Sequence, residues 1–151
     1  MLDLKQTPAI GEEIIARSFP PITRHVLALY CGASGDLNPI HVDSDFARDA
    51  GFPDVFAHGM LVMAYLGQAL TDAVPPASLR SFSTRFVAIT RLGARIDCTG
   101  EVVEIFEEAG EKRMRIALVA QDQDGDVKLK GDAVVAAPAH DEAQAGRPAG
   151  G

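Results

Sequence analysis

Residues 59–71 form the segment that most constrains the fold of this chain, because apolar residues surround the helix they predict on every side. The apolar members are Met60, Leu61, Val62, Met63, Ala64, Tyr65, Leu66, Ala69 and Leu70. A helix of this kind has to be enclosed on most sides. In a chain of 151 residues, a single sheet would have to curl around it. The segment contains Gln68 and is about half as long as a membrane span, so we expect no membrane insertion.

The second half of the chain supplies the strands of such a sheet. Residues 81–88, 113–120 and 127–135 alternate with the period of two that strands with unlike faces show. Lys128 falls on the polar face of the last of these. A further strand is expected at residues 94–106, with turns at 109–110 and at Asp124-Gly125, a strong hairpin signal. The predicted order is one strand at residues 11–19, then helices, then about four antiparallel strands joined by tight turns.

Two shorter helices are predicted between the first strand and the apolar helix. Thr23 fits the N-cap of a helix over residues 24–33, and a second helix is expected over residues 45–50. Cys31 lies on the apolar face of the first helix and is expected in the core. The fold class is therefore α+β, with one domain over residues 1–138 and a disordered tail over residues 139–151.

Charge and cysteine content exclude several classes of function. The 14 Lys and Arg residues against 21 Asp and Glu residues leave a net charge of −7, so no nucleic-acid or anionic-membrane partner is expected. Cys31 and Cys98 are far apart and predict neither a disulfide framework nor a zinc site. Together with a start that does not read as a secretory signal, this favours a reducing cytoplasm.

The most informative segment for chemistry reads Ser-Gly-Asp-Leu-Asn-Pro-Ile-His at residues 34–41. A turn at Asn38-Pro39 can bring Asp36 and His41 face to face. A carboxylate and an imidazole that share one water are a workable pair for adding or removing water. The alternative is a capped turn, in which Asp36 and Asn38 accept backbone N–H groups and His41 packs at the edge. Spacing alone does not decide between the two.

Two other kinds of site compete for these residues. Imidazole and carboxylate groups at His41, Asp43, Asp45 and His58 are ligand types that suit a divalent metal ion, although Asp45 fits the start of a helix better. Ser34 lies in a Gly-Ala-Ser-Gly segment that misses the Gly-x-Ser-x-Gly nucleophile motif by one position. We therefore expect neither a metal centre nor a serine hydrolase.

The start of the apolar helix, His58-Gly59, is a candidate anion-binding position. The first N–H groups of a helix are unpaired, and glycine lets a ligand approach the backbone closely. Such a donor suits a thioester oxygen that gains charge as an enolate forms. The alternative is that Gly59 only permits tight packing.

Together these segments resemble the MaoC-like dehydratases, the (R)-specific enoyl-CoA hydratase group of the hot-dog superfamily. The signature Gly-Asp-x-Asn-Pro-aliphatic-His is unbroken at residues 35–41, and Ala47 occupies the small position six residues later. Residues 56–60 (Phe-Ala-His-Gly-Met) and 83–86 (Ser-Thr-Arg-Phe) extend the match, which covers residues 10–138. The family's Pro-Val and Gly-Asp after this point are reduced to Gly93.

The resemblance implies a hot-dog fold, in which an antiparallel sheet wraps around a central helix, and a homodimer or a heterodimer with a second hot-dog chain. It implies hydration of a trans-2-enoyl thioester to the (R)-3-hydroxyacyl thioester, and the reverse dehydration. Asp36 is the implied base on the water that attacks the β-carbon, and His41 orients this water and helps to deliver a proton to the α-carbon. Gly59 and Asn38 are the implied substrate-binding residues: the Gly59 N–H binds the thioester carbonyl and Asn38 holds the loop. The resemblance also implies that the substrate is a thioester of CoA or of acyl carrier protein, and that the reaction needs no metal, nicotinamide or flavin cofactor.

Two other functions remain open within this resemblance: a 3-hydroxyacyl-carrier-protein dehydratase subunit that needs a partner chain, and a non-catalytic acyl-thioester binder. Candidates to contact a carrier protein or CoA phosphates are Arg24, Arg80, Arg85 and Arg91, although solvation or a weak ion pair is the more ordinary role of each. Candidates to line an acyl channel are Leu61, Met63 and Tyr65, for which core packing is the simpler role.

Overall fold

Five antiparallel strands form one sheet in the order β1-β3-β4-β5-β2 in the computed structural model, which describes residues 7–138. The elements are β1 (Glu13–Ser18), α1 (Arg24–Ser34), η1 (Pro39–His41), α2 (Ser44–Asp49), α3 (Gly59–Ala73), η2 (Pro76–Ser78), β2 (Leu79–Phe86), β3 (Ile96–Glu108), β4 (Glu111–Asp122) and β5 (Val127–Ala136). They confirm each predicted strand and helix to within a few residues. The tail predicted at residues 139–151 lies outside the described residues.

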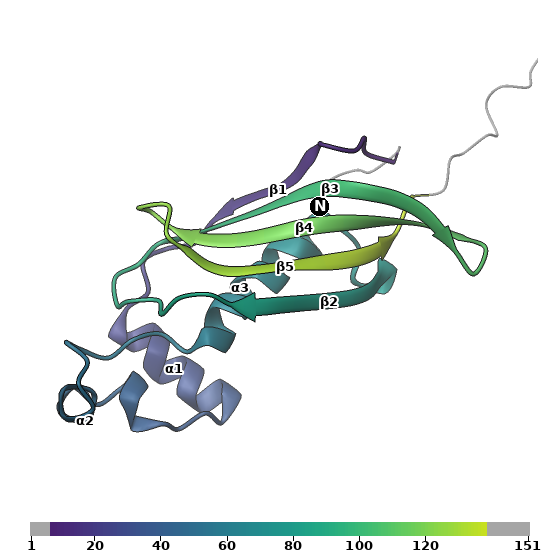
Figure 1. Cartoon of the computed structure of the whole chain (residues 1–151). Coiled ribbons are helices and arrows are strands. Elements are labelled where there is room, and N and C mark those ends of the chain that lie inside the picture. The colour runs from purple at the N-terminus through teal and green to yellow at the C-terminus, as the bar shows by residue number, and fades with distance from the viewer. Residues whose placement is uncertain (1–6, 139–151) are drawn as a thin grey trace, which may run out of the picture.

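The curved sheet covers one side of the apolar helix α3, as Figure 1 shows. The helix contacts all five strands. Its buried residues are Leu61, Val62, Leu66, Ala69, Leu70 and Ala73. A stripe four residues apart, at Met60, Ala64, Gln68 and Asp72, stays exposed. The sheet of one chain therefore encloses α3 on one side only, and the stripe is apolar where the helix begins.

The two-residue alternation correctly predicted which face of β4 is buried. Met114, Ile116, Leu118 and Ala120 are buried, and the residues between them are partly exposed. In β5 the alternation was wrong at Lys128, whose side chain is only 5% exposed. Burial alone would lower the pKa of Lys128, but hydrogen bonds to Asp126 and Asp122 outweigh that effect and raise it. The ammonium group can be buried because two carboxylates of the adjoining turn neutralise it.

Two of the expected tight turns are present, and one is wrong. Hairpins join β3 to β4 and β4 to β5, with Gly110 and Gly125 at positive φ. Between β2 and β3 the predicted turn does not occur, because β2 pairs with β5 while β3 pairs with β1 and β4. Residues 87–95 instead cross the end of the sheet, where the Gly93 N–H donates to the Ile22 carbonyl at 2.8 Å. Alternation identifies the face of a strand but not its neighbour.

Gly131 is required where β5 meets β2. A Cβ atom at this position would lie 2.0 Å from the Ser83 carbonyl oxygen and 2.8 Å from the Thr84 Cα atom. Because these are backbone atoms of a paired strand, they cannot turn aside. We expect Gly131→Ala to lower the free energy of unfolding by about 3 kcal/mol, at the upper end of the usual cost of overpacking.

Urea unfolding of Gly131→Ala and of Gly32→Ala measures this effect against a matched control. Gly32 lies within α1, where a Cβ atom meets nothing within 4 Å, so alanine should stabilise the chain by about 0.5–1 kcal/mol. Equal unfolding midpoints for the two variants would show that the close approach of β2 to β5 is not as tight as described.

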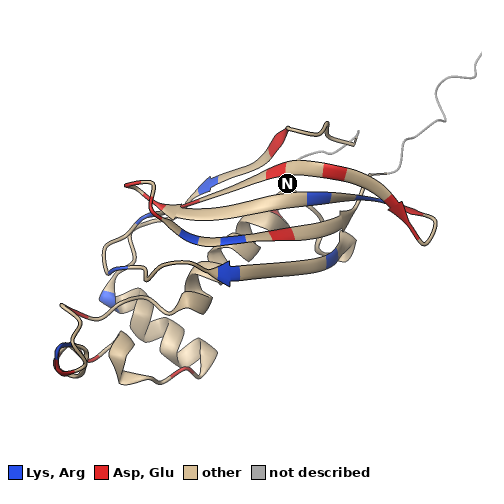
Figure 2. Cartoon of the chain, viewed as in Figure 1, with Lys and Arg blue, Asp and Glu red and all other residues tan. Residues whose placement is uncertain are grey.

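Charged side chains on the strands pair with one another across the sheet, and Figure 2 shows basic and acidic positions on neighbouring strands. Arg115 contacts Glu104 at 2.8 Å and Asp132 at 3.1 Å. Arg113 pairs with Glu111 at 2.8 Å and also with Glu108. The arginines of β4 therefore lie among carboxylates of the same surface. Within residues 7–138, no helix is long and apolar enough to cross a membrane.

Candidate active site

The end of α1 sets the position of the loop that carries Asp36. Gly35 adopts φ 73°, and its N–H donates to the Cys31 carbonyl at 3.0 Å, which closes the helix. The Ser34 hydroxyl donates to the Tyr30 carbonyl at 2.6 Å and accepts the Asp36 N–H at 3.1 Å. Ser34 thus joins the helix end to the loop, and its hydroxyl is engaged with the backbone rather than arranged as a nucleophile.

Residues 36–41 form a capped turn. Asp36 Oδ1 accepts the Asn38 N–H at 3.3 Å, and Asn38 Oδ1 accepts the Ile40 N–H at 3.1 Å. Pro39 then begins the short helix η1, which ends at His41. The second carboxylate oxygen of Asp36, Oδ2, takes no part in these hydrogen bonds of the turn. The turn and the acid–imidazole pair, which the sequence leaves as alternatives, therefore coexist in one loop.

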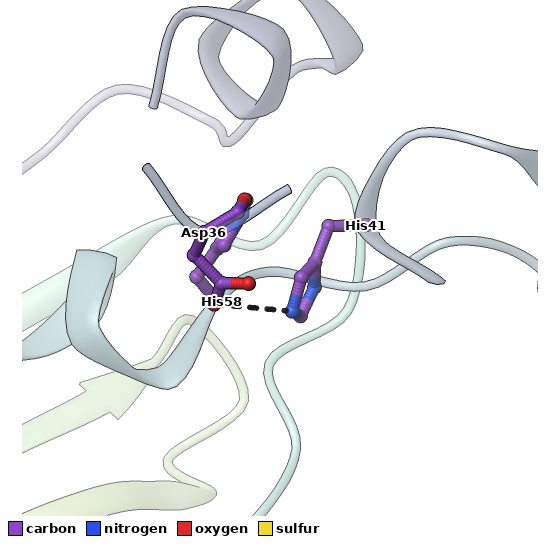
Figure 3. A group of neighbouring side chains, drawn as sticks. All are labelled: Asp36, His41 and His58. Atoms are coloured by element: carbon purple, nitrogen blue, oxygen red, sulfur yellow. Dashed lines mark hydrogen bonds and ion pairs between the residues drawn. The ribbon is translucent and has the colours of Figure 1, made fainter. Parts of the chain in front are cut away.

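Asp36 and His41 face each other, as Figure 3 shows. Asp36 Oδ2 lies 4.0 Å from His41 Nε2, which is too long for a hydrogen bond but lets one water bond to both atoms. The other ring nitrogen of His41, Nδ1, lies 2.7 Å from the Phe56 carbonyl oxygen. Because a carbonyl only accepts, Nδ1 carries the hydrogen of neutral His41, and Nε2 presents a lone pair toward Asp36. The Asp36 side chain is 50% exposed, whereas that of His41 is 10% exposed.

His58 completes the cluster; the sequence grouped it with His41 only as a possible metal ligand, and its contacts with His41 and Asp36 were not predicted. The ring stacks on that of His41, with centroids 3.8 Å apart and planes 25° from parallel. Its Nε2 lies 3.4 Å from the Asp36 carbonyl oxygen, and Tyr30 contacts it edge-on at 4.9 Å. Burial, and then the nearby His41, lower the pKa of His58. The match at residues 56–60 drew attention to this segment but not to the stacking.

Of the four residues considered as metal ligands, only His41 and His58 come together. Asp43 caps α2 by accepting the N–H groups of Asp45 and Phe46, and Asp45 pairs with Arg48 at 3.2 Å. The ligand atoms that do gather, within 4.8 Å, are those of Asp36, His41 and His58. The rings of His41 and His58 are stacked and nearly parallel, and each has one nitrogen engaged with a backbone carbonyl. That geometry suits a hydrogen-bonded water better than the converging ligands of a tetrahedral ion.

Gly59 begins α3 without a side-chain cap from His58, its N-cap residue. The first N–H groups of the helix therefore depend on other partners. A Cβ atom at Gly59 would lie 2.8 Å from Cε1 of the Phe86 ring, which is 52% exposed at the end of β2. Close packing and an open helix start thus occur at the same residue.

The candidate arginines divide into two groups. Arg24 pairs with Asp54 at 2.5 Å, and Arg80 pairs with Glu111 at 2.6 Å, so both have ordinary surface partners. Within the described residues, Arg85 and Arg91 form no ion pair. Arg91 lines a cavity of about 830 Å³ on which Phe56 also borders.

The candidate channel residues take up core positions to different extents. Leu61 is buried, and the ring of Tyr65 stacks on Phe19 with centroids 4.4 Å apart. Met63 is partly buried and packs against the core. Core packing accounts for Leu61 and Tyr65 without a ligand, and their contact with an acyl chain stays a prediction.

Comparison with known proteins places this geometry in a family. The model of the MaoC-like domain matches residues 5–123. The (R)-specific enoyl-CoA hydratase of Rhodospirillum rubrum is 30% identical over 120 residues, which cover 78% of this chain and 81% of the hydratase. The 3-hydroxybutyryl-CoA dehydratase of Methylorubrum extorquens is 36% identical over 114 residues, 73% of this chain and 69% of the dehydratase. The fatty acid synthase subunit beta of Aspergillus oryzae is 37% identical over 114 residues, which are 72% of this chain but 5% of that subunit.

Solved structures agree with these relatives. The unliganded R-hydratase PhaJ1 of Pseudomonas aeruginosa superposes with a TM-score of 0.76 at 28% identity, covering 87% of this chain and 83% of that one. The (R)-hydratase of A. caviae gives a TM-score of 0.77 at 24% identity, covering 88% and 99%, which supports the fold. The expected α+β hot-dog architecture is thus confirmed. The chain belongs to the MaoC-like dehydratase family of hot-dog hydro-lyases.

Proposed function

We propose that this chain adds water to trans-2-enoyl thioesters to give (R)-3-hydroxyacyl thioesters and catalyses the reverse dehydration. The observation that carries the proposal is the 4.0 Å separation of Asp36 Oδ2 and His41 Nε2, two proton acceptors that face one small space. The hydrogen bond from His41 to the Phe56 carbonyl supports it, because it leaves Nε2 free to accept. The names of the relatives supply the substrate class.

In this mechanism the two acceptors orient one water. Its O–H groups point to Asp36 and His41, so an oxygen lone pair remains for the β-carbon of the substrate. As the C–O bond forms, Asp36 takes a proton from the water, and the electron pair of the double bond moves toward the thioester carbonyl as an enolate. This proton then passes from Asp36, with the help of His41 Nε2, to the α-carbon. The pair ends as it began, and both new bonds form on the same face of the substrate.

The Gly59 N–H is the proposed donor to the thioester oxygen. We expect Gly59→Ala to lower kcat by about 10- to 100-fold, because a methyl group against Phe86 displaces either the ring or the helix start, and small displacements cost this much. Steady-state kinetics would be compared with Gly67→Ala in the same helix, where a Cβ atom meets Phe82 at an ordinary 3.4 Å. Similar kcat values for the two variants would show that the close packing of Gly59 against Phe86 is not needed for turnover.

A second hot-dog domain is the proposed partner, most simply a second copy of this chain. β2 is an edge strand, and exposed apolar side chains gather where it ends and α3 begins: Met60, Phe86, Val87 and Ile89. An exposed apolar surface beside the proposed site is typical of an interface with another protein domain. Mass measurement in solution tests this: a dimer agrees with the proposal, and an active monomer contradicts it.

A thioester of acyl carrier protein is the second candidate substrate. It is favoured by matches to fungal fatty acid synthase subunits and to the 3-hydroxyacyl-[acyl-carrier-protein] dehydratase FERN of Solanum lycopersicum, 26% identical over 109 residues. The deciding experiment presents trans-2-enoyl groups of graded length on CoA and on carrier protein and follows loss of the conjugated absorbance. Turnover of the CoA series, with an (R)-alcohol as product, supports the main proposal. Turnover of the carrier series alone keeps the reaction but makes acyl carrier protein the carrier of the substrate, and turnover of neither series contradicts the proposal.

A further inference from the structure

We infer that His58 is a positioning residue for this hydration: its ring N–H holds the Asp36 peptide beside His41, on whose ring it stacks. The inference rests on the proposed function and deepens it. His58 touches both members of the pair from a third segment of chain, the N-cap of α3. No part of the mechanism described above uses it.

The hydrogen bond to Asp36 is the contact that matters most. His58 Nε2 lies 3.4 Å from the Asp36 carbonyl oxygen, and across residues 7–138 it is the one donor found for that oxygen. Cys31 Sγ lies 3.4 Å from the same nitrogen and supports the ring from α1. The Asp36 side chain is half exposed, and the other hydrogen bonds of this residue are local: its N–H donates to Ser34 at the end of α1, and its carboxylate accepts the Asn38 N–H. His58 therefore ties the base to a distant segment, the start of α3.

His41, by contrast, has an anchor of its own. The Phe56 carbonyl holds Nδ1 at 2.7 Å, and the Phe56 ring packs edge-on at 5.3 Å. Loss of the His58 ring should therefore move His41 little. Loss of the His58 N–H should release the Asp36 backbone and change the 4.0 Å gap that the water has to bridge.

Burial and the neighbouring His41 lower the pKa of His58 and favour its neutral form. His58 is only 1% exposed, and in the described part of the chain its Nδ1 has no hydrogen-bond partner. A hydrogen on Nδ1 would be a buried donor without an acceptor, so the neutral form with hydrogen on Nε2 fits the site. Only the His41 ring of the stacked pair is then free to gain a proton during the reaction.

Two variants separate the contributions of the N–H and of the ring. His58→Gln can place an amide N–H near the position of Nε2, and His58→Phe keeps an aromatic ring without a donor. We expect His58→Phe to lower kcat about 10- to 100-fold, with KM changed by less than about twofold, because a displaced catalytic group costs this much. His58→Gln should keep kcat within about fivefold of wild type on the same reasoning. Equal damage in both variants, or none in either, would overturn the inference.

A double variant distinguishes positioning of Asp36 from a purely structural role of His58. Combined with Asp36→Asn, His58→Phe should lower kcat by less than about twofold further, because residues that act as a unit are not additive. A full further loss would contradict the inference.

Nitrogen-15 spectra of the histidine rings in the wild-type protein give a test that depends neither on activity nor on the folding of any variant. Hydrogen on Nε2 alone at pH 7 supports the inference, and hydrogen on Nδ1 overturns it, even if no thioester is turned over and the proposed function has failed.

Discussion

Asp36→Asn should lower kcat for hydration of a trans-2-enoyl thioester by about 10²- to 10⁴-fold, the usual contribution of a positioned general base. The amide occupies the same volume and keeps an oxygen to accept the Asn38 N–H, so the turn survives. What it loses is the negative charge and the second acceptor that faces His41 Nε2 across 4.0 Å. KM should change little, since the loss falls on the transition state.

Steady-state kinetics and thermal unfolding of the same preparation measure this effect. Asp45→Asn is the matched control, because Asp45 is an exposed carboxylate on the neighbouring helix α2 and, among residues 7–138, forms an ion pair only with Arg48. It should match wild type in both measurements. If Asp36→Asn retained more than about a tenth of wild-type kcat, far above what loss of a general base leaves, Asp36 could not be the base.

His41→Asn should have an effect of similar size, about 10²- to 10⁴-fold on kcat. The asparagine side-chain nitrogen lies where Nδ1 was, so it can still donate to the Phe56 carbonyl and keep the segment before α3 in place. Nothing then occupies the position of Nε2, and the water loses one of its two acceptors. The variant therefore separates the orienting role of His41 from its structural role.

The expected result is a folded protein with almost no hydration and a modestly lower unfolding midpoint, because the ring contacts of His41 with Phe56 and His58 are lost. His25→Asn serves as the control, because His25 is an exposed histidine on α1 away from the loop that carries Asp36. A His41→Asn variant that unfolds at a much lower temperature would show that the Phe56 contact does not survive. His41→Gln, which can place a polar atom near the former Nε2, would then be compared with it. Near wild-type turnover by either folded variant contradicts the assignment.

Local patterns were sufficient to predict most of the elements and part of the site. The alternation in β4 predicted its buried face, and the unbroken segment at residues 35–41 predicted that Asp36 and His41 lie near each other. Both predictions depend on steric preferences of neighbouring residues: the pleat of a strand in one case, and Gly35 and Pro39 at fixed offsets in the other.

Features that depend on distant segments were not predictable in this way. The pairing of β2 with β5 is a choice between distant strands that alternation does not encode. Lys128 is buried because of the carboxylates of a turn, which its position in the pattern does not reveal. The support of the site by the Phe56 carbonyl and the His58 ring comes from a segment 15 or more residues away from His41 and uses a backbone oxygen and a ring face. Contacts made by a backbone carbonyl or by the face of a ring produce no recognisable spacing of residues in the sequence.

The central claim is that one pair of side chains handles both the water and the proton. Hydration of trans-2-butenoyl-CoA in heavy water, followed by NMR of the product, tests it most directly. Because Asp36 and His41 hold one water between them, the oxygen and the proton reach the same face of the substrate, so we expect one deuterium at the α-carbon on the face that receives the hydroxyl group. The proposed function gives this hydroxyl group the (R) configuration. Deuterium on the opposite face, or on both faces equally, would mean that the proton comes from elsewhere and would contradict the claim.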